Sequence, residues 1–285
     1  GATLTKVPNF LITATSRPRQ YVLRRPKGRH QLKAYPGDNF YLVIGMPTAV
    51  VVDGAYFLRR FEYRYPGLDS SAPKDVAAGL LWLAGAHIAV RTKSDPTSLI
   101  RTIDGQKQFD TTWTESPELY RIFFYDCPPL TKRTQLPISK QAPDLARTDA
   151  AQSRLAIHAE LLTVRKVALR LGRLNEKFGW RPKSGAINRW LSGASAFDPI
   201  DDDFEIDTVQ KGVDMRLGLD VAAMAFKRQV KQIVLVAADS DFVPAVKLAR
   251  REGIDVILDP MGGHAAKDLI AHVDGVRDIP RTGRD

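Results

Sequence analysis

The sequence predicts an α/β domain with a mainly parallel central sheet and helices on both of its faces. Four short apolar runs alternate along the chain with segments of helical character. Continuous apolar runs of this length are typical of strands that are buried on both faces. Strands that alternate with helices predict right-handed crossovers, which place helices on both sides of the sheet.

Each of the four expected strands is followed by an aspartate. The strands cover residues 49–52, 122–125, 233–238 and 255–258, and the aspartates are Asp53, Asp126, Asp239 and Asp259. Ligands of open parallel sheets bind beyond the carboxyl ends of the strands. Aspartates at these ends therefore converge on one rim, where they repel one another unless a hard divalent cation binds them.

The expected helices lie between and around these strands. They cover residues 73–87, 150–177, 214–227 and 242–252. The helix at 214–227 is apolar nearly all round, so we expect it to be deeply packed. We expect Asp241 to cap the helix at 242–252 and also to face the rim. Residues 62–118, apart from the helix, and residues 178–203 are interpreted as insertions.

Most of the net positive charge lies at the start of the chain. Residues 1–45 contain eight basic residues and one acidic residue, so they carry +7 of the total net charge of +10. A disordered basic segment of this kind would bind phosphates in a salt-dependent way. Two interpretations stay open: a basic, disordered N-terminal extension, or non-native sequence that precedes a domain covering residues 46–280.

Cysteine, histidine and hydropathy patterns exclude several classes of protein. The single cysteine, Cys127, excludes an internal disulfide and a thiolate zinc site, and it favours the reducing cytoplasm. The five histidines show no paired metal-ligand spacing, so we interpret them as structural. The longest apolar run, residues 76–90, is shorter than the roughly 20 residues that span a bilayer, so no membrane partner is expected.

An aspartate after a strand is also a common helix cap or turn residue. This structural interpretation is favoured for Asp259, which precedes a proline, and it has equal weight with a functional one for Asp126. Asp53 and Asp239 follow strands that are too apolar to need a carboxylate for solubility. The functional interpretation is therefore favoured for these two.

A further acid, Asp214, begins the helix at 214–227. A carboxylate there complements the helix dipole, so a cap alone would explain it. The nearby Lys211 and the apolar character of the helix make a site residue the more specific interpretation. Asp220 lies roughly 240° further round the helix, so we interpret it as a structural or supporting residue.

Three motifs occur in a suggestive order along the chain. They are Val50-Val51-Val52-Asp53-Gly54, Lys211-Gly212-Val213-Asp214 and Ala238-Asp239-Ser240-Asp241-Phe242-Val243-Pro244. Together with residues 247–254, this set resembles the NYN domain, a branch of the PIN-like nucleases. The resemblance covers roughly residues 47–280, and the segments 62–118 and 178–203 match poorly.

The resemblance implies a three-layer α/β/α sandwich in which the strand before Asp53 lies beside the strand before Asp239. It also implies a metal-dependent endoribonuclease that acts on single-stranded or structured RNA with Mg²⁺ or Mn²⁺. The catalytic residues would be Asp53, Asp214, Asp239 and Asp241. Asp53 and Asp239 would bind the metal directly, while Asp214 and Asp241 would orient water or support a second ion. Asp126 resembles an accessory acid of some bacterial members.

Candidate substrate-binding residues lie near these acids in the sequence. Lys211 and Arg216 would neutralise phosphate charge. Trp180, Arg181 and Lys183 alternate aromatic and basic side chains, a pattern that suits stacking on unpaired bases and pairing with phosphates. For both sets the structural alternative stays open, as solvated helix-start residues or as tryptophans that pack onto the sheet.

Other functions also fit the sequence. A non-catalytic RNA-binding regulatory protein with the same fold would bind without metal and would not cleave. A DNA-directed nuclease of the flap-endonuclease type is a second alternative, because composition does not separate RNA from DNA. A phosphatase with an aspartate nucleophile fits less well, since Gly54-Ala55 follows Asp53 where such enzymes carry a second aspartate. Whether the chain forms a homo-oligomer is left open.

Overall fold

A computed structural model of the chain describes four strands near the start and residues 47–281. Within the second range, residues 104–105, 110–111, 176–178, 194–196 and 209 are not described. The chain divides into two compact units, residues 1–44 and 45–285. In the first unit, the strands β1 (Leu4–Val7), β2 (Phe10–Ala14), β3 (Tyr21–Arg24) and β4 (Arg29–Gln31) form an antiparallel sheet in that order. The expected extension over residues 1–45 otherwise lies outside the described residues.

The second unit is built on a six-stranded sheet whose neighbouring strands are all parallel. In order across the sheet, the strands are β16 (Gly275–Val276), β15 (Asp255–Asp259), β14 (Gln232–Val236), β5 (Thr48–Asp53), β8 (Leu119–Asp126) and β9 (Val167–Leu171). The strand β5 is thus central, with β14 on one side and β8 on the other.

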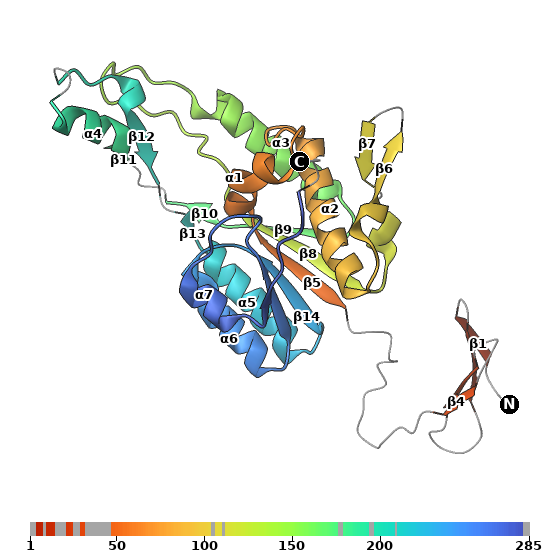
Figure 1. Cartoon of the computed structure of the whole chain (residues 1–285). Coiled ribbons are helices and arrows are strands. Elements are labelled where there is room, and N and C mark those ends of the chain that lie inside the picture. The colour runs from red at the N-terminus through yellow and green to blue at the C-terminus, as the bar shows by residue number, and fades with distance from the viewer. Residues whose placement is uncertain are drawn as a thin grey trace. The chain divides into compact units, whose positions relative to one another are not determined.

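Helices cover both faces of this sheet. The helices α1 (Gly54–Arg64), α2 (Pro73–Arg91) and α3 (Asp149–Thr163) pack on one face. The helices α5 (Val213–Phe226), α6 (Val243–Arg251) and α7 (Lys267–His272) pack on the other. In Figure 1, β5 and β14 pass between the two sets. This arrangement confirms the predicted three-layer α/β/α sandwich with a mainly parallel sheet.

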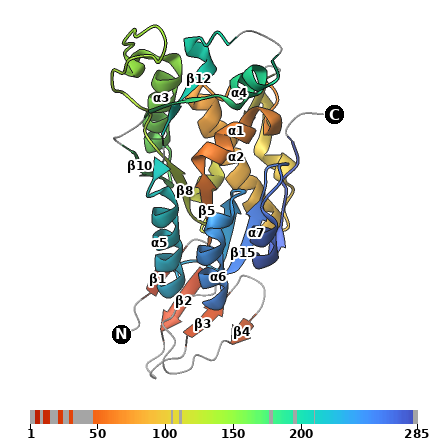
Figure 2. The ribbon, with the colours of Figure 1, turned by 90° about the vertical axis from the view of Figure 1, so that its left-hand side faces the viewer.

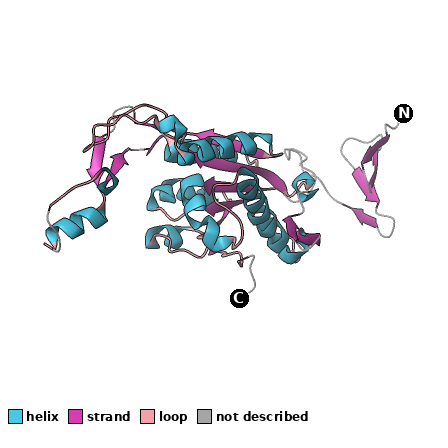
Figure 3. Ribbon diagram, turned by 90° about the horizontal axis from the view of Figure 1, so that it is seen from above, coloured by secondary structure: helices cyan, strands magenta, loops and turns pink. Residues whose placement is uncertain are grey.

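The remaining elements are short. A hairpin is formed by β6 (Ile100–Ile103) and β7 (Gln106–Phe109), and β10 (Arg173–Leu174) pairs with β13 (Gln210–Lys211). The strands β11 (Gly179–Pro182) and β12 (Phe204–Asp207) pair around α4 (Ser184–Leu191). This last group lies apart from the helices that cover the sheet, as Figure 3 shows. Among the described helices, none has both the length and the apolar character that crossing a membrane requires.

Side-chain alternation along the strands produces two separate cores. In β5, Val50 and Val52 face α1–α3, whereas Ala49 and Val51 face α5–α7, and all four are fully buried. Successive side chains of a strand point to opposite faces of the sheet. A strand that is covered on both faces therefore needs apolar residues at every position, which explains the four continuous runs in the sequence.

The helix predicted over residues 150–177 is wrong in its second half. The helix α3 ends at Thr163, and β9 follows as the edge strand beside β8. Between them Lys166 has a φ of 61°, which a continuous right-handed helix excludes. Valine and leucine occupy positions 167, 169 and 171, a period of two that is typical of a strand.

The expectation that the helix at 214–227 is packed on all sides is also wrong. On α5, Leu217 and Val221 are buried, but Met215 and Leu219 are 68% and 64% exposed. The helix packs against α6, β8 and β9 near the end of the sheet, so only one of its sides is covered. Figure 2 shows α5 and α6 lying side by side on this face.

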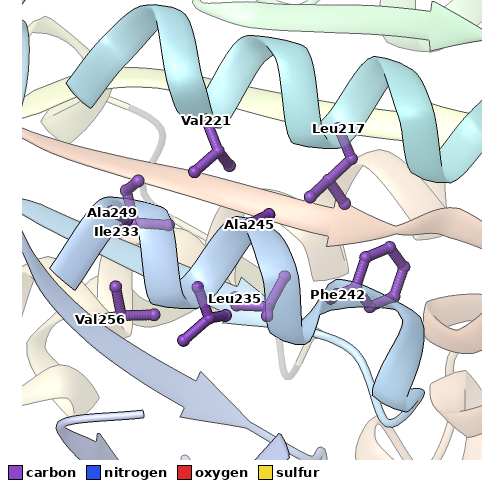
Figure 4. Close-up of a pocket in the computed structure, with 9 residues that line it drawn as sticks. Leu217, Val221, Ile233, Leu235, Phe242, Ala245, Ala249 and Val256 are labelled. Atoms are coloured by element: carbon purple, nitrogen blue, oxygen red, sulfur yellow. The ribbon is translucent and has the colours of Figure 1, made fainter. Parts of the chain in front are cut away.

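The layer between α5, α6 and the sheet contains a cavity of about 10 Å³. Figure 4 shows that only apolar side chains line it, among them Leu217, Val221, Leu235 and Phe242. A buried water needs polar partners, which this cavity lacks. It is therefore a gap in the packing and not a ligand site.

The contrast between Leu217 and Leu219 gives a test of this packing. We expect Leu217→Ala to lower the free energy of unfolding by about 3 kcal/mol, because it enlarges a cavity in the core. Leu219→Ala, on the exposed side of the same helix, should change it by less than about 0.5 kcal/mol. Urea denaturation measures both values. Equal losses in the two variants would contradict the described orientation of α5.

Candidate functional site

The strands β5 and β14 bring two aspartates to the same edge of the sheet. They are parallel neighbours, with Val52 opposite Val236. Asp53 ends β5, and Asp239 follows shortly after the end of β14. The predicted adjacency of these two strands is therefore confirmed, and both carboxylates belong to the edge at which open α/β sheets bind ligands.

Asp53 is held in place by the start of α1. Its Oδ1 accepts a hydrogen bond of 3.1 Å from the backbone N–H of Tyr56, so it caps this helix. The next residue, Gly54, lies against β8, because a Cβ there would come within 2.5 Å of the Phe124 ring and 2.7 Å of the Tyr125 carbonyl. Glycine thus lets α1 begin directly at the strand end and fixes the half-buried Asp53 carboxylate beside the sheet.

Asp239 and Asp241 lie on a short 3₁₀ turn, Ser240–Phe242, that leads into α6. The Asp239 Oδ1 accepts from the backbone N–H of Asp241 at 3.2 Å, so Asp239 is the cap of this turn. The helix α6 itself has no side-chain cap. The prediction that Asp241 caps it is therefore wrong: the turn begins two residues earlier, and the exposed Asp241 carboxylate is left free of that role.

Asp214 lies in the first turn of α5. Gly212 caps this helix with a φ of 80°, a left-handed conformation that favours glycine. Burial raises the pKa of Asp214 above its ordinary value, and the negative charges of Asp241 and Asp239 raise it further. Asp214 is thus electrostatically coupled to the two acids that follow β14.

Asp53 is also repelled by a neighbouring carboxylate, that of Asp214. Burial raises the pKa of its carboxyl group, and the charge of Asp214 adds to this, whereas the Tyr56 N–H and the Arg59 guanidinium oppose it. Within the described part of the chain, none of the four acids Asp53, Asp214, Asp239 and Asp241 forms an ion pair. Apart from the influence of Arg59 on Asp53, the described part of the rim therefore carries several carboxylates without a cation to neutralise them.

Unneutralised carboxylates of this kind fit a hard divalent cation. Mg²⁺ takes oxygen ligands, keeps several waters and is often held by only one or two protein carboxylates. Over the residues that the structure describes, no three acidic, histidine or cysteine side chains are grouped closely enough to hold a metal ion. The arrangement therefore fits a cation with at most two direct protein ligands, and the other acids would act through water.

The other two strand-end aspartates have different surroundings. Asp126 is buried, and its Oδ2 accepts from His158 at 2.8 Å and from Arg154 at 3.0 Å. Asp259 is buried as well, with His87 at 2.8 Å and Arg64 at 3.4 Å. Both charges are compensated inside the protein, so a role of Asp126 as an accessory acid stays a prediction.

Asp259 also fulfils its predicted turn role. Its Oδ1 accepts from the backbone N–H of Met261 at 2.7 Å, two residues further on. Burial lowers the pKa of His87, while the bond to Asp259 opposes this change. The structural interpretation of both His87 and Asp259 is thus supported by their contacts.

Cys127 lies between the two groups of acids. Burial raises the pKa of its thiol to about 11, and the charges of Asp126 and Asp214 contribute to the rise, whereas Arg154 opposes it. Without a bound metal, a thiol with this pKa stays protonated near neutral pH. Its electrostatic neighbours show that Arg154, Asp126 and Asp214 all lie near the same end of the sheet.

The candidate substrate residues are placed in two groups. Lys211 and Arg216 flank the start of α5 and are exposed, with no ion pair among the described residues. In the β11–β12 group, Trp180 donates its indole N–H to the Gln135 carbonyl at 2.8 Å. Arg181 and Lys183 form ion pairs with acidic residues of the same group, Arg181 with Glu205 and Asp207 and Lys183 with Asp202.

Several supporting residues were not predicted as partners. Asp220 accepts from the Tyr125 hydroxyl and from Arg170, both at 2.9 Å, which agrees with its structural interpretation. His158 and Arg154 bind Asp126 across 32 and 28 residues of sequence. No local motif marks such a contact, because it depends on how α3 packs against the end of β8.

Comparison with known proteins identifies the second half of this unit. Residues 173–280 match the model of the NYN domain family, a PIN-like family related to nucleases. This confirms the predicted resemblance over that segment. It includes Asp214, Asp239 and Asp241, whereas Asp53 lies outside it. No match was found among curated proteins or among solved structures.

The raised pKa values of Asp53 and Asp214 predict how the stability of the metal-free protein depends on pH. An acid whose pKa is raised by folding stabilises the fold below its ordinary pKa of 3.8 and loses this contribution as the pH rises through the raised value. We therefore expect Asp214→Asn and Asp53→Asn to raise the melting temperature in EDTA at pH 7, and to have little effect at pH 3.5. Asparagine caps a helix as well as aspartate does, so α1 should keep its start.

Asp220→Asn serves as the matched control for these melts. This variant weakens the contact with Arg170, so it should lower the melting temperature at pH 7. If Asp214→Asn melts at a lower temperature than the wild type at pH 7, the Asp214 carboxylate of the wild type is not repelled by the other acids of the rim.

Proposed function

Because residues 173–280 carry an NYN domain, we propose that this chain is a metal-dependent endoribonuclease that hydrolyses RNA phosphodiester bonds. Asp53 and Asp239 would bind Mg²⁺ or Mn²⁺ directly, Asp214 would hold the cation through water, and Asp241 would lie beside them as the fourth catalytic residue. One observation supports this most: carboxylates without ion-pair partners, from three separate segments, influence one another at the end of the sheet. In a folded protein such repulsion is a cost unless a cation relieves it.

The protein residues would have separate tasks. The caps at α1 and at the 3₁₀ turn hold Asp53 and Asp239 in fixed positions, with one oxygen of each engaged by a backbone N–H. The exposed Asp214 and Asp241 would accept hydrogen bonds from water near the phosphate and hold it in line for attack. When bound, the cation supplies a Lewis acid for the phosphate and lowers the pKa of a water molecule.

Substrate binding would rest on exposed cations near the acids. Lys211 and Arg216 are free to pair with phosphates, because no described acid binds them. Arg181 and Lys183 are already paired, so a phosphate would have to compete with Glu205 and Asp202 for them. The indole N–H of Trp180 donates to Gln135 in the plane of the ring, which would fix the orientation of the ring for stacking on a base.

A non-catalytic RNA-binding protein of the same fold is the second candidate. It is favoured by one observation, that no three metal-ligand side chains are grouped among the described residues. A DNA-directed nuclease would use the same acids, so substrate competition separates it from a ribonuclease. The cytoplasmic location that the single Cys127 favours, and a homo-oligomeric state, stay predictions.

Cleavage of labelled single-stranded RNA tests the proposal. With Mn²⁺ or Mg²⁺ we expect the wild type to cleave, and EDTA to abolish cleavage. Replacing groups that only support a metal ligand lowers activity by roughly 10–100-fold, so loss of a direct ligand in Asp53→Asn or Asp239→Asn should lower it by about 100-fold or more. Single-stranded DNA of the same sequence, added as a competitor, reports on the sugar preference.

Glu160→Gln is a matched control, because it removes one negative charge from α3 without touching a rim acid. It should keep wild-type activity. Cleavage that survives EDTA, or equal cleavage by the wild type and Asp53→Asn, would refute the metal mechanism. RNA binding without cleavage in any metal would favour the non-catalytic alternative. Circular dichroism establishes that each variant is folded.

A further inference from the structure

An open cavity of about 340 Å³, lined by both polar and apolar side chains, lies between α1 and α3, and the proposed mechanism does not use it. Leu58 of α1 and Ile157 of α3 contribute apolar surface, while Asp149 and Arg154 of α3 contribute opposite charges. Small-molecule sites commonly have a volume of roughly 300–1,000 Å³ and combine apolar walls with a few polar groups. The cavity is thus large enough to hold part of a ligand such as one nucleobase.

The two charged residues of the cavity still have free hydrogen-bonding groups. Arg154 is anchored through one nitrogen, Nη1, which donates to the buried Asp126 Oδ2 at 3.0 Å. Its other guanidinium nitrogens, and both oxygens of Asp149, have no partner among the described residues. The cavity therefore presents a fixed donor group and an acceptor pair that a ligand can use.

The hydroxyl groups that line the cavity can accept hydrogen bonds from a ligand, but their protons are already donated to protein groups. The Ser70 Oγ donates to Glu62 at 2.7 Å, and the Ser153 Oγ donates to the Ser71 carbonyl at 2.7 Å. Because each hydroxyl has a single proton, these oxygens have only lone pairs left for a ligand. A ligand that fits must hence offer adjacent donors to Asp149 and adjacent acceptors to Arg154.

Among the four RNA bases, guanine has this pattern. Its N1–H and N2–H groups are adjacent donors that a carboxylate can accept, and its O6 and N7 are adjacent acceptors that arginine recognises. Adenine presents an acceptor, N1, where guanine has a donor. Uracil offers a single N–H on its pairing edge. The unpaired bases of single strands expose these edges to proteins.

Two of the residues that line the cavity connect it to the end of the sheet that carries the proposed catalytic rim. Leu58 lies one and a half turns along the helix that Asp53 caps, and Arg154 binds Asp126 at the end of β8. In the sheet, Tyr125, the residue before Asp126, is paired with Asp53. A base in the cavity would thus belong to a nucleotide close to the cleaved phosphate.

We propose that this cavity binds a guanine base of the substrate strand, with Asp149 and Arg154 as the residues that determine specificity. The proposal rests on the proposed function in one respect, that the substrate is a nucleic acid. It predicts a preference for guanosine next to the cleavage point. A fixed arginine and a carboxylate without a partner, in one cavity beside the rim, support it.

Binding without cleavage provides the test. Fluorescein-labelled single-stranded octauridylate, with one central position changed to guanosine, inosine or adenosine, is titrated with the full chain in EDTA, and fluorescence anisotropy gives the Kd. A bidentate base contact discriminates by about 1–3 kcal/mol, so we expect guanosine to bind about tenfold more tightly than adenosine. Inosine lacks the N2 amino group and should fall between them.

Asp149→Asn should reduce the preference for guanosine to less than twofold, because an amide cannot accept from two adjacent donors. Asp149 is exposed and has no hydrogen-bond or ion-pair partner in the described part of the chain, so this variant should fold like the wild type. Glu160→Gln, the same change of charge on the same helix outside the cavity, should keep the full preference. Equal affinities for guanosine and adenosine in the wild type, or an undiminished preference in Asp149→Asn, would overturn the proposal.

This design separates the two proposals. Cleavage of all the oligonucleotides at equal rates, with equal affinities, overturns the guanine site and leaves the nuclease function standing. A guanosine preference that depends on Asp149, in a protein that never cleaves with metal, supports the guanine site and refutes the nuclease.

Discussion

The parallel pairing of β5 with β14 is the constraint on which the candidate site depends. It places Asp53 beside the segment that carries Asp239 and Asp241, although nearly two hundred residues of sequence separate them. The register is fixed because both faces of β5 are buried, so a slip by one residue would exchange the side chains of the two cores. The packing of the whole sandwich thus determines where a small group of carboxylates lies.

The four strand-end aspartates have two different kinds of surroundings. Asp126 and Asp259 are buried, and each is compensated by a histidine and an arginine. Asp53 and Asp239 receive backbone N–H groups from the turns that follow them, and neither forms an ion pair with a described residue, although the charge of Arg59 acts on Asp53. A helix cap fixes the position of a carboxylate while leaving its charge largely available. Capping and metal binding are therefore compatible roles at Asp53 and Asp239, and not alternatives.

The sequence predicted those features that depend on local pattern. The continuous apolar runs predicted β5, β8, β14 and β15, and the aspartates after them lie at the carboxyl ends of these strands, as expected. It failed where tertiary packing decides. The prediction of a helix over β9 is wrong, because the apolar residues of this strand also fit the end of a helical pattern. The exposed side of α5 depends on where the sheet ends. The contact of His158 with Asp126 depends on how α3 packs. No local sequence pattern indicates either feature.

The proposed division of the chain between catalytic residues and residues that determine specificity follows from the same topology. The segment that matches the NYN family, residues 173–280, provides Asp214, Asp239 and Asp241, whereas Asp53 and the cavity between α1 and α3 come from earlier residues. Among the described contacts, the Asp53 cap joins α1 to the rim, and Arg154 and His158 join α3 to Asp126 at the end of β8. Asp149 takes part in none of these contacts, so it can change without disturbing the acids. In the proposed arrangement, the preferred base could therefore vary while the chemistry at the strand ends stays the same.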